Sequence, residues 1–261
     1  MYDFEFVKPS TIAEATKALT AEGAQALSGG QTLVPTMKQR LASPGVLVSL
    51  TGIAETQGVC KGDGGLHIGA ATPHAVVARE AASHYPALAA LAGGIGDPAV
   101  RNRGTLGGSI ANNDPAACYP SAVLGSGATV VTNKRKIAAD DYFQGMFTTA
   151  LEEGEFITEV AFPIPEKAAY VKFNQPASRF ALTAVFVAKY PDGVRVAVTG
   201  ASNDGVFRWS EAEEALSKDF SAAALAGLSV DHSDFISDLH GTPAYRGNLV
   251  KVLTARAVAA A

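Results

Sequence analysis

Apolar and polar positions before residue 97 alternate between helical and strand-like periods, which is typical of a chain with alternating helices and strands. Thr11 and Glu14 have the spacing of a helix capping box, and the amphipathic run that follows can end at Gly23. Short apolar runs bounded by Gly, Ser and Pro predict strands. We therefore expect helices over 12–19, 32–41, 73–82 and 86–91, strands over 24–27 and 46–50, and a hairpin over 59–70.

The segment from Asp97 to Pro120 differs from its surroundings because it is dense in Gly, Asn, Asp and Pro. It is too long for a simple connection, and such loops are usually functional or disordered. The apolar residues on both sides favour a functional loop. Beyond this segment we expect two further strands, over 128–132 and 156–164.

The order of elements changes near Pro165–Lys167, where we expect a domain boundary. Three strand-like runs joined by turn signals come first, over 170–173, 181–190 and 194–199. Helical runs follow, over 210–216, 222–228 and from Pro243 onwards, with Thr242 as a cap. Strands followed by helices indicate an antiparallel sheet covered by helices. We predict an α+β protein with one domain over residues 1–165 and a second over 166–261.

The composition narrows the function classes. Hydrophobic residues make up 48% and charged residues 18%, so the chain can bury a sizeable core. The net charge is -4 and no Lys/Arg tract occurs, which argues against binding to nucleic acid or anionic lipid. Cys60 and Cys118 lack metal-ligand spacing, so neither a metal site nor a disulfide framework is expected. No signal peptide or apolar run of ~20 residues is present, and we expect a cytoplasmic protein without a membrane span.

Familiar catalytic motifs are missing from the sequence. It contains no Walker-type phosphate loop, no G-x-S-x-G and no H-E-x-x-H. The run from Gly62 to His67 begins like a dinucleotide fingerprint but lies in a hairpin, so a Rossmann domain is rejected. The five histidines are scattered without metal-ligand spacing, and we interpret each as a surface residue or a satisfied core residue. No catalytic acid, base or nucleophile is assigned.

Two glycine-containing loops remain as candidates for chemistry. The first covers Leu27–Leu33 and links a predicted strand to a helix; the second covers Thr105–Pro115. Both place Gly-Gly beside small hydroxyl residues, so their main-chain N–H groups can approach an anion without a lysine. Two such loops facing each other would enclose a pyrophosphate, and Asp114 would accept hydrogen bonds from sugar or ribityl hydroxyls. The alternative is that each Gly-Gly is a turn that needs a positive φ.

These residues resemble the FAD-binding medium subunit of molybdenum hydroxylases of the xanthine dehydrogenase and carbon monoxide dehydrogenase type. The resemblance rests on the runs 28–35 and 96–116, with further matches at 68–74, 170–173 and 244–246, and it extends over essentially the whole chain. It implies a PCMH-type FAD-binding domain of two subdomains, followed by a small domain with an antiparallel sheet and helices. The chain is somewhat short for the family, with the trimming around 217–233.

The resemblance also implies which residues bind FAD. Two pyrophosphate loops, a carboxylate for a polyol hydroxyl, an aliphatic residue against the isoalloxazine ring and a lysine correspond to Ser28, Gly29, Gly30, Gln31, Thr32, Leu33, Thr105, Gly107, Gly108, Ser109, Asp114, Ile157 and Lys172. After Lys172-Phe173 the family continues with basic residues, whereas this chain has Asn174-Gln175-Pro176. Neither loop contains a histidine for covalent attachment, so FAD is expected to bind non-covalently. Arg101 and Arg103 match the pattern and either contact the cofactor or brace the loop.

The resemblance implies an electron relay. A large molybdopterin-binding subunit would oxidise the substrate, and a small [2Fe–2S] subunit would pass electrons to FAD on this chain, in an (αβγ)2 heterohexamer. NAD, a quinone or oxygen is the final acceptor, and the sequence does not select among them or identify the substrate. Two other hypotheses stay open: a stand-alone FAD-dependent oxidoreductase of the same fold, and a non-enzymatic scaffold whose glycine loops are only turns.

Overall fold

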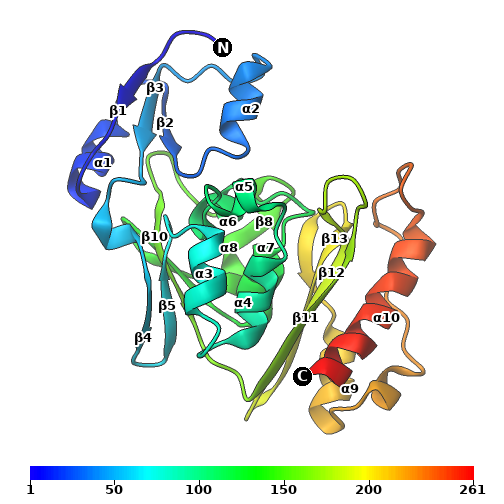
Figure 1. Ribbon diagram of the computed structural model, residues 1–261. Helices are drawn as coiled ribbons and strands as arrows, with labels where there is room; N and C mark the ends of the chain where they lie inside the picture. The colour runs from blue at the N-terminus through cyan, green and yellow to red at the C-terminus, as the bar shows by residue number, and fades with distance from the viewer.

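The N-terminal lobe of the chain is a small parallel sheet with two helices. In a computed structural model that describes residues 1–261, its strands pair in the order β1-β3-β2 (Figure 1). Thr11 caps the first helix by accepting the N–H of Glu14, but the Glu14 carboxylate accepts from Ser10, so only half of the expected capping box forms. The elements are β1 (Glu5–Val7), α1 (Ile12–Ala18), β2 (Ala24–Leu27), α2 (Leu33–Lys38) and β3 (Val46–Ser49).

The middle lobe is built on an antiparallel five-stranded sheet with the order β4-β5-β10-β6-β7. The predicted 59–70 hairpin is confirmed, because β4 pairs with β5. The helices α3, α4 and α7 lie together beside this sheet (Figure 1). The elements are η1 (Ala54–Thr56), β4 (Val59–Gly62), β5 (Gly65–Gly69), α3 (His74–Glu80), α4 (Pro86–Gly93), β6 (Thr129–Thr132), β7 (Lys136–Ala138), α8 (Ala139–Tyr142), β8 (Phe143–Gly145), β9 (Thr148–Thr149) and β10 (Ile157–Phe162).

The prediction of a long loop over 97–120 is wrong, because most of this segment is helical. It forms α5 (Pro98–Arg101), α6 (Leu106–Asn112) and the start of α7 (Tyr119–Gly125). Asp97 and Thr105 cap α5 and α6 through their side chains. Gly107 is tolerated inside α6 because the helix packs closely on the main chain of Ala70. Tertiary packing thus outweighs the low helix propensity of glycine.

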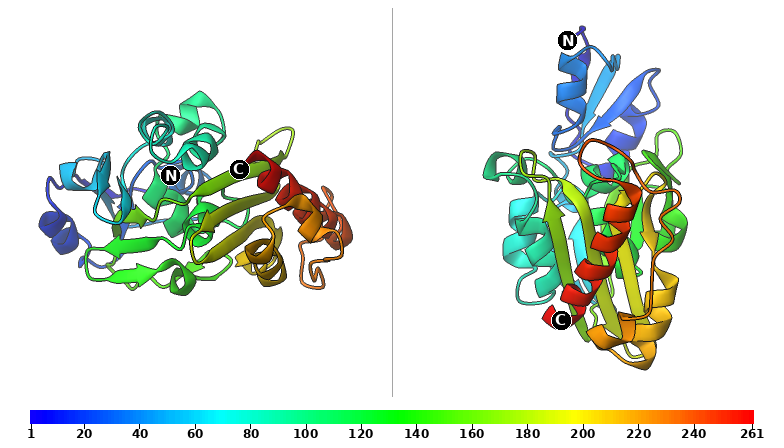
Figure 2. Two further views of the ribbon diagram at one scale, coloured as in Figure 1. Left: turned by 90° about the horizontal axis from the view of Figure 1, so that it is seen from below. Right: turned by 90° about the vertical axis from the view of Figure 1, so that its right-hand side faces the viewer.

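The C-terminal lobe is an antiparallel four-stranded meander, β11-β12-β13-β14. The antiparallel sheet and its first three strands are predicted by the sequence, whereas β14 is not. Alternate residues of β12 enter two cores: Phe186 and Ala188 face the middle lobe, whereas Val185 and Val187 pack under the C-terminal helices. α10 lies across the outer face of this sheet (Figure 2). The elements are β11 (Lys167–Asn174), β12 (Ala181–Tyr190), β13 (Gly193–Ser202), β14 (Gly205–Arg208), α9 (Ser210–Lys218), η2 (Ala222–Leu225) and α10 (Pro243–Ala260).

Local signals set the start of the last helix. Thr242 caps α10 by accepting the N–H of Tyr245, and Pro243 occupies the first helical position, both as predicted.

The expected helix over 222–228 is only a short 3₁₀ turn, η2. No helix of the chain combines the length and the apolar character that crossing a bilayer requires.

Candidate functional site

A cavity of about 450 Å³ lies where the N-terminal lobe meets the middle lobe. This is within the range typical of small-molecule and cofactor sites. Residues from all three lobes line it. The main lining segments are 25–33 from the N-terminal lobe, 104–109 and 155–157 from the middle lobe, and 178–180 from the C-terminal lobe.

The first glycine loop connects β2 to α2 along one wall of the cavity. No main-chain N–H from Ser28 to Thr32 donates a hydrogen bond within the protein, so five consecutive donors are left for another partner. Gly30 has a φ of +70°, a conformation that glycine adopts without strain. Unpaired main-chain donors are costly unless water or a ligand pairs with them. The loop therefore has the properties of an anion cradle, as the sequence indicates.

The second glycine loop differs from the expectation, because its amides are already used. The Leu106 N–H donates to the Thr72 carbonyl, and that of Gly107 donates to the Ala70 carbonyl at 2.8 Å. The Gly108 N–H donates to Thr105 Oγ1. Among residues 105–109, the Thr105 N–H and the Ser109 hydroxyl remain without a partner in the protein. The second loop presents hydroxyl groups to the cavity, and its glycines serve mainly the close packing of α6.

The two loops nevertheless converge on the same cavity. Ser28 Oγ and Thr105 Oγ1 share a hydrogen bond of 2.8 Å across 77 positions of sequence. A Cβ atom on Gly29 would lie 2.1 Å from the Arg103 carbonyl oxygen, so only glycine permits this approach. The two glycine loops therefore lie side by side. A single diphosphate that contacts both loops would require this arrangement.

Asp114 lies at the cavity one residue after Asn113, whose left-handed φ of +44° ends α6 and turns the chain. Asp114 Oδ1 accepts the N–H of Ala116 at 2.8 Å, which fixes the carboxylate. Its Oδ2 has no partner in the protein and can accept a hydrogen bond from a hydroxyl group. This geometry is compatible with the role that the sequence suggests for Asp114.

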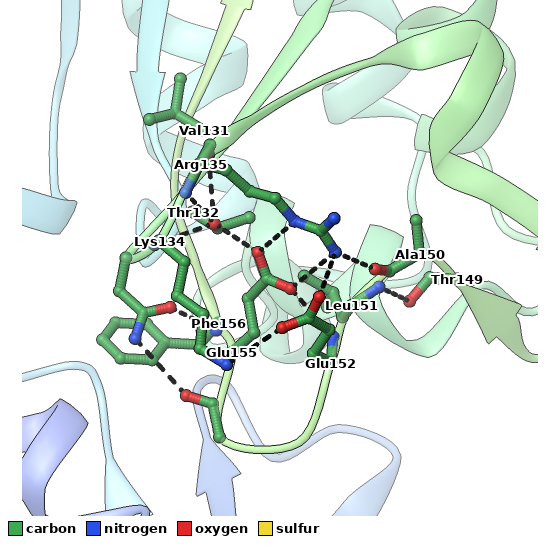
Figure 3. A network of polar contacts seen from close by, with 12 residues as sticks. Val131, Thr132, Lys134, Arg135, Thr149, Ala150, Leu151, Glu152, Glu155 and Phe156 are labelled. Atoms are coloured by element: carbon green, nitrogen blue, oxygen red, sulfur yellow. Dashed lines mark hydrogen bonds and ion pairs between the residues drawn. The ribbon is translucent and has the colours of Figure 1, made fainter.

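A buried carboxylate supports another wall of the cavity. The Glu155 side chain is fully enclosed, and it accepts hydrogen bonds from Thr132 Oγ1 at 2.7 Å and from the Arg135 guanidinium at 3.1 Å (Figure 3). Burial raises the pKa of Glu155, but these bonds outweigh it and lower the pKa to about 2. The carboxylate is therefore charged and fixed, and it holds the segment 155–157 in place. This network has no motif of its own in the sequence.

Phe156 and Ile157, which follow Glu155, join the two lobes on either side of the cavity. Phe156 packs in the core of the N-terminal lobe, and Ile157 packs in the core of the middle lobe. Ile157 also lines the cavity, as the sequence predicts. The segment thus sets the distance between the two lobes.

Lys172 is not among the residues that line the cavity. Its ammonium group donates to the carbonyls of Gly94 at 2.6 Å and Arg179 at 3.1 Å, and it lies 3.6 Å from Cys118 Sγ. Lys172 therefore ties β11 to the end of α4 and to the segment that precedes β12. Arg179 and Cys118 do line the cavity, so Lys172 contacts two residues of its wall, and a direct contact of Lys172 with FAD stays a prediction.

Arg101 and Arg103, which precede the second loop, differ in their contacts. Arg101 Nη1 donates to the carbonyls of Ile95 and Gly96, which closes the turn before α5. Arg103 contributes its carbonyl group at the contact with Gly29, and its side chain makes no hydrogen bond in the protein. For Arg101 the bracing interpretation is therefore the one that the contacts support.

Some cavity residues were missed by sequence reasoning. His74 is 4% exposed, lines the cavity and has an unpaired ring nitrogen, so its interpretation as a surface or satisfied residue is wrong. Burial, aided by the charge of Arg101, lowers its pKa to about 4, so the ring is neutral at physiological pH. Phe180 and Glu155 also line the cavity. Only the position of His74 within the matching run 68–74 marked it in the sequence.

These groups fit FAD. Five unpaired amides and two glycines form a cradle for a diphosphate, and a fixed carboxylate with a free oxygen suits a polyol. The apolar wall that includes Ile95 and Ile157 suits a flat ring system. No lysine lines the cavity, and Arg179 is the one arginine among its lining residues, so the free amides of the first loop and Arg179 are the groups suited to an anion.

Comparison with known proteins supports the same assignment. The family described as FAD binding domain in molybdopterin dehydrogenase matches residues 2–165. The nicotine 6-hydroxylase medium subunit of Paenarthrobacter nicotinovorans is 33% identical over 97% of this chain and 95% of its own. The carbon monoxide dehydrogenase medium chain of Afipia carboxidovorans is 32% identical, over 98% and 95%. The quinoline 2-oxidoreductase structure from Pseudomonas putida 86 superposes with a TM-score of 0.88 at 27% identity, covering 100% of this chain and 97% of that one.

The family match covers more than half of the chain, and relatives above 30% identity cover nearly all of it. Fold, cavity and comparisons agree on one conclusion: this chain belongs to the family of FAD-binding domains of molybdopterin dehydrogenases, and it is an FAD-binding component of an oxidoreductase.

Proposed function

We propose that this chain is the flavoprotein subunit of a heteromeric molybdenum hydroxylase. In that assembly it receives electrons from [2Fe–2S] clusters on a small subunit and passes them to an external acceptor, while a large subunit carries the molybdopterin cofactor and the substrate. The relatives named medium subunit or medium chain support this place in a larger complex. The (αβγ)2 stoichiometry is part of the proposal.

The observation that carries the proposal is the convergence of two loops on one cavity. The unpaired amides of 28–32 come from the N-terminal lobe, and the Thr105 hydroxyl that meets Ser28 comes from the middle lobe. A dinucleotide held there bridges two lobes, so its binding also orders them relative to each other.

The residues of this chain bind and orient the cofactor. The amides of 28–32 pair with the diphosphate, Asp114 Oδ2 accepts from a polyol hydroxyl, and Ile157 provides an apolar contact for the ring. Bound FAD supplies the ability to take up electrons singly and release them in pairs. The Glu155–Arg135 ion pair keeps Ile157 in position. FAD is bound non-covalently in this proposal.

The division of labour in the chain follows from the three lobes. We assign residues 1–165 to FAD binding and 166–261 to a second domain that closes one end of the cavity through 178–180.

The unpaired thiols Cys60 and Cys118 suit a reducing compartment, so we place the protein in the cytoplasm.

The test is purification of the chain together with the products of the adjacent genes. We expect a yellow complex with one FAD per chain, released by acid precipitation, together with iron–sulfur and molybdenum chains. The isolated chain should bind FAD but should not turn over substrate. Turnover by the isolated chain would instead establish a stand-alone oxidoreductase. A colourless chain whose melting temperature does not rise with FAD would leave only a scaffold role.

A further inference from the structure

His74 has an unusual position for a histidine, at the start of α3 and directly beneath the second glycine loop. Its main-chain N–H donates to the Gly104 carbonyl at 2.9 Å, and its ring stacks at an angle on Tyr119 with centroids 5.3 Å apart. A Cβ atom on Gly104 would lie 2.6 Å from His74 Nε2. The absence of a side chain at Gly104 therefore makes the space that the imidazole fills.

The two ring nitrogens of His74 have different surroundings. Nδ1 is enclosed by protein atoms and has no hydrogen-bond partner. Nε2 is not enclosed and makes no hydrogen bond in the protein, and the open space that His74 borders is the cavity. A neutral imidazole carries one N–H, and placing it on Nε2 leaves only a lone pair enclosed at Nδ1. The low pKa agrees with this neutral form.

No protein group is placed to pair with His74 Nε2. Water can do so while the cavity is open, but FAD in the cavity displaces that water. A donor that loses water without gaining an acceptor costs about 1–3 kcal/mol. The occupant of the cavity is therefore the available partner for this N–H. FAD presents acceptors on its phosphates, its ribityl chain and its ring.

We infer that His74 is an FAD-binding residue that donates a hydrogen bond from Nε2 to an acceptor atom of the bound cofactor. The inference rests on the proposed placement of FAD in this cavity. It gives FAD a hydrogen-bond donor from α3 beside the second loop, where the amides of 106–108 are not available for binding.

The test compares FAD affinity among wild type, His74→Ala, His74→Gln and the control His84→Ala, which removes an exposed histidine. Quenching of FAD fluorescence on titration with apoprotein gives the dissociation constants. One hydrogen bond of about 1–1.5 kcal/mol predicts a loss of affinity of about 5- to 12-fold in His74→Ala. His74→Gln keeps an N–H donor and should stay within threefold of wild type, as should His84→Ala.

Imidazole ¹⁵N spectra of the wild-type chain provide a second measurement that does not depend on a variant folding. We expect an Nε2–H tautomer for His74 and a shift of that resonance when FAD binds, with the signal assigned through its correlation to the sequentially assigned main chain. Affinities for FAD that are equal in wild type and His74→Ala would overturn the inference, as would a proton on Nδ1. Failure of wild type itself to bind FAD would instead refute the proposed function.

Discussion

Replacement of Gly29 by alanine is the most direct perturbation of the contact between the two glycine loops. The added Cβ would lie 2.1 Å from the Arg103 carbonyl oxygen and 2.7 Å from Gly104 Cα. Both neighbours are main chain, which no change of rotamer can move aside. Since Cβ contacts below 3.0 Å are essentially never observed, the loops must separate by about 1 Å. The Ser28–Thr105 hydrogen bond of 2.8 Å would stretch with them.

Overpacking of this kind costs about 1–3 kcal/mol. The apoprotein can relax by moving the N-terminal lobe away, whereas a bound dinucleotide needs both loops at their native distance. Most of that energy should therefore appear as lost affinity, which corresponds to a rise in the FAD dissociation constant of about 5- to 150-fold.

Fluorescence titration of apoprotein with FAD measures the loss of affinity, and thermal melting of the apoprotein measures the part of the cost that destabilises the fold itself. Gly227→Ala is the matched control, because a Cβ there meets nothing within 4 Å and its φ is not positive. We expect Gly227→Ala to bind FAD as wild type does. If Gly29→Ala also binds FAD within threefold of wild type, the loops do not act together on the cofactor and the reasoning fails.

Two further predictions concern stability. Gly107→Val should destabilise the fold by about 1–3 kcal/mol in urea, and not only weaken FAD binding, because its Cβ would lie 2.6 Å from Ala70 Cβ; an unchanged unfolding midpoint would contradict this packing role. Folding lowers the pKa of Glu155 to about 2, so as pH falls its carboxylate is protonated in the unfolded chain before it is protonated in the folded chain. The stabilisation of the fold by the Glu155 carboxylate is therefore present above pH 4.5 and is lost between about pH 4.5 and 2. The expected loss is ~2 kcal/mol, less than the full pKa shift would give, because the half-exposed Arg135 is screened by solvent. Glu155→Gln should remove that part of the pH dependence, and equal acid slopes in the two proteins would refute it.

Local chemistry determined much of the fold, and it was readable from the sequence. Thr11 and Thr242 start helices through their own side chains, and the 59–70 hairpin depends on a Gly-rich turn. The nearly continuous apolar run of β12, bounded by turn signals, predicted a strand. Such features depend on neighbours within a few positions, so their residue types suffice.

The first glycine loop was also determined by the sequence. Gly30 adopts the positive φ that its residue type permits, at the junction of a strand and a helix. The free amides of 28–32 follow from that local geometry. The resemblance carried by this run and by 96–116 pointed to the family to which the chain belongs.

Tertiary structure alone decided which polar groups remain available in the cavity. The amides of Leu106 and Gly107 are occupied by Thr72 and Ala70, more than 30 positions earlier in the chain. Lys172 is drawn away from the cavity by Gly94, and His74 is left with a free Nε2 because Gly104 makes room for its ring. A hydrogen-bonding group is free or used according to what the fold brings beside it. Contacts between residues so far apart in sequence exist only once the lobes have packed together, and no local pattern encodes them.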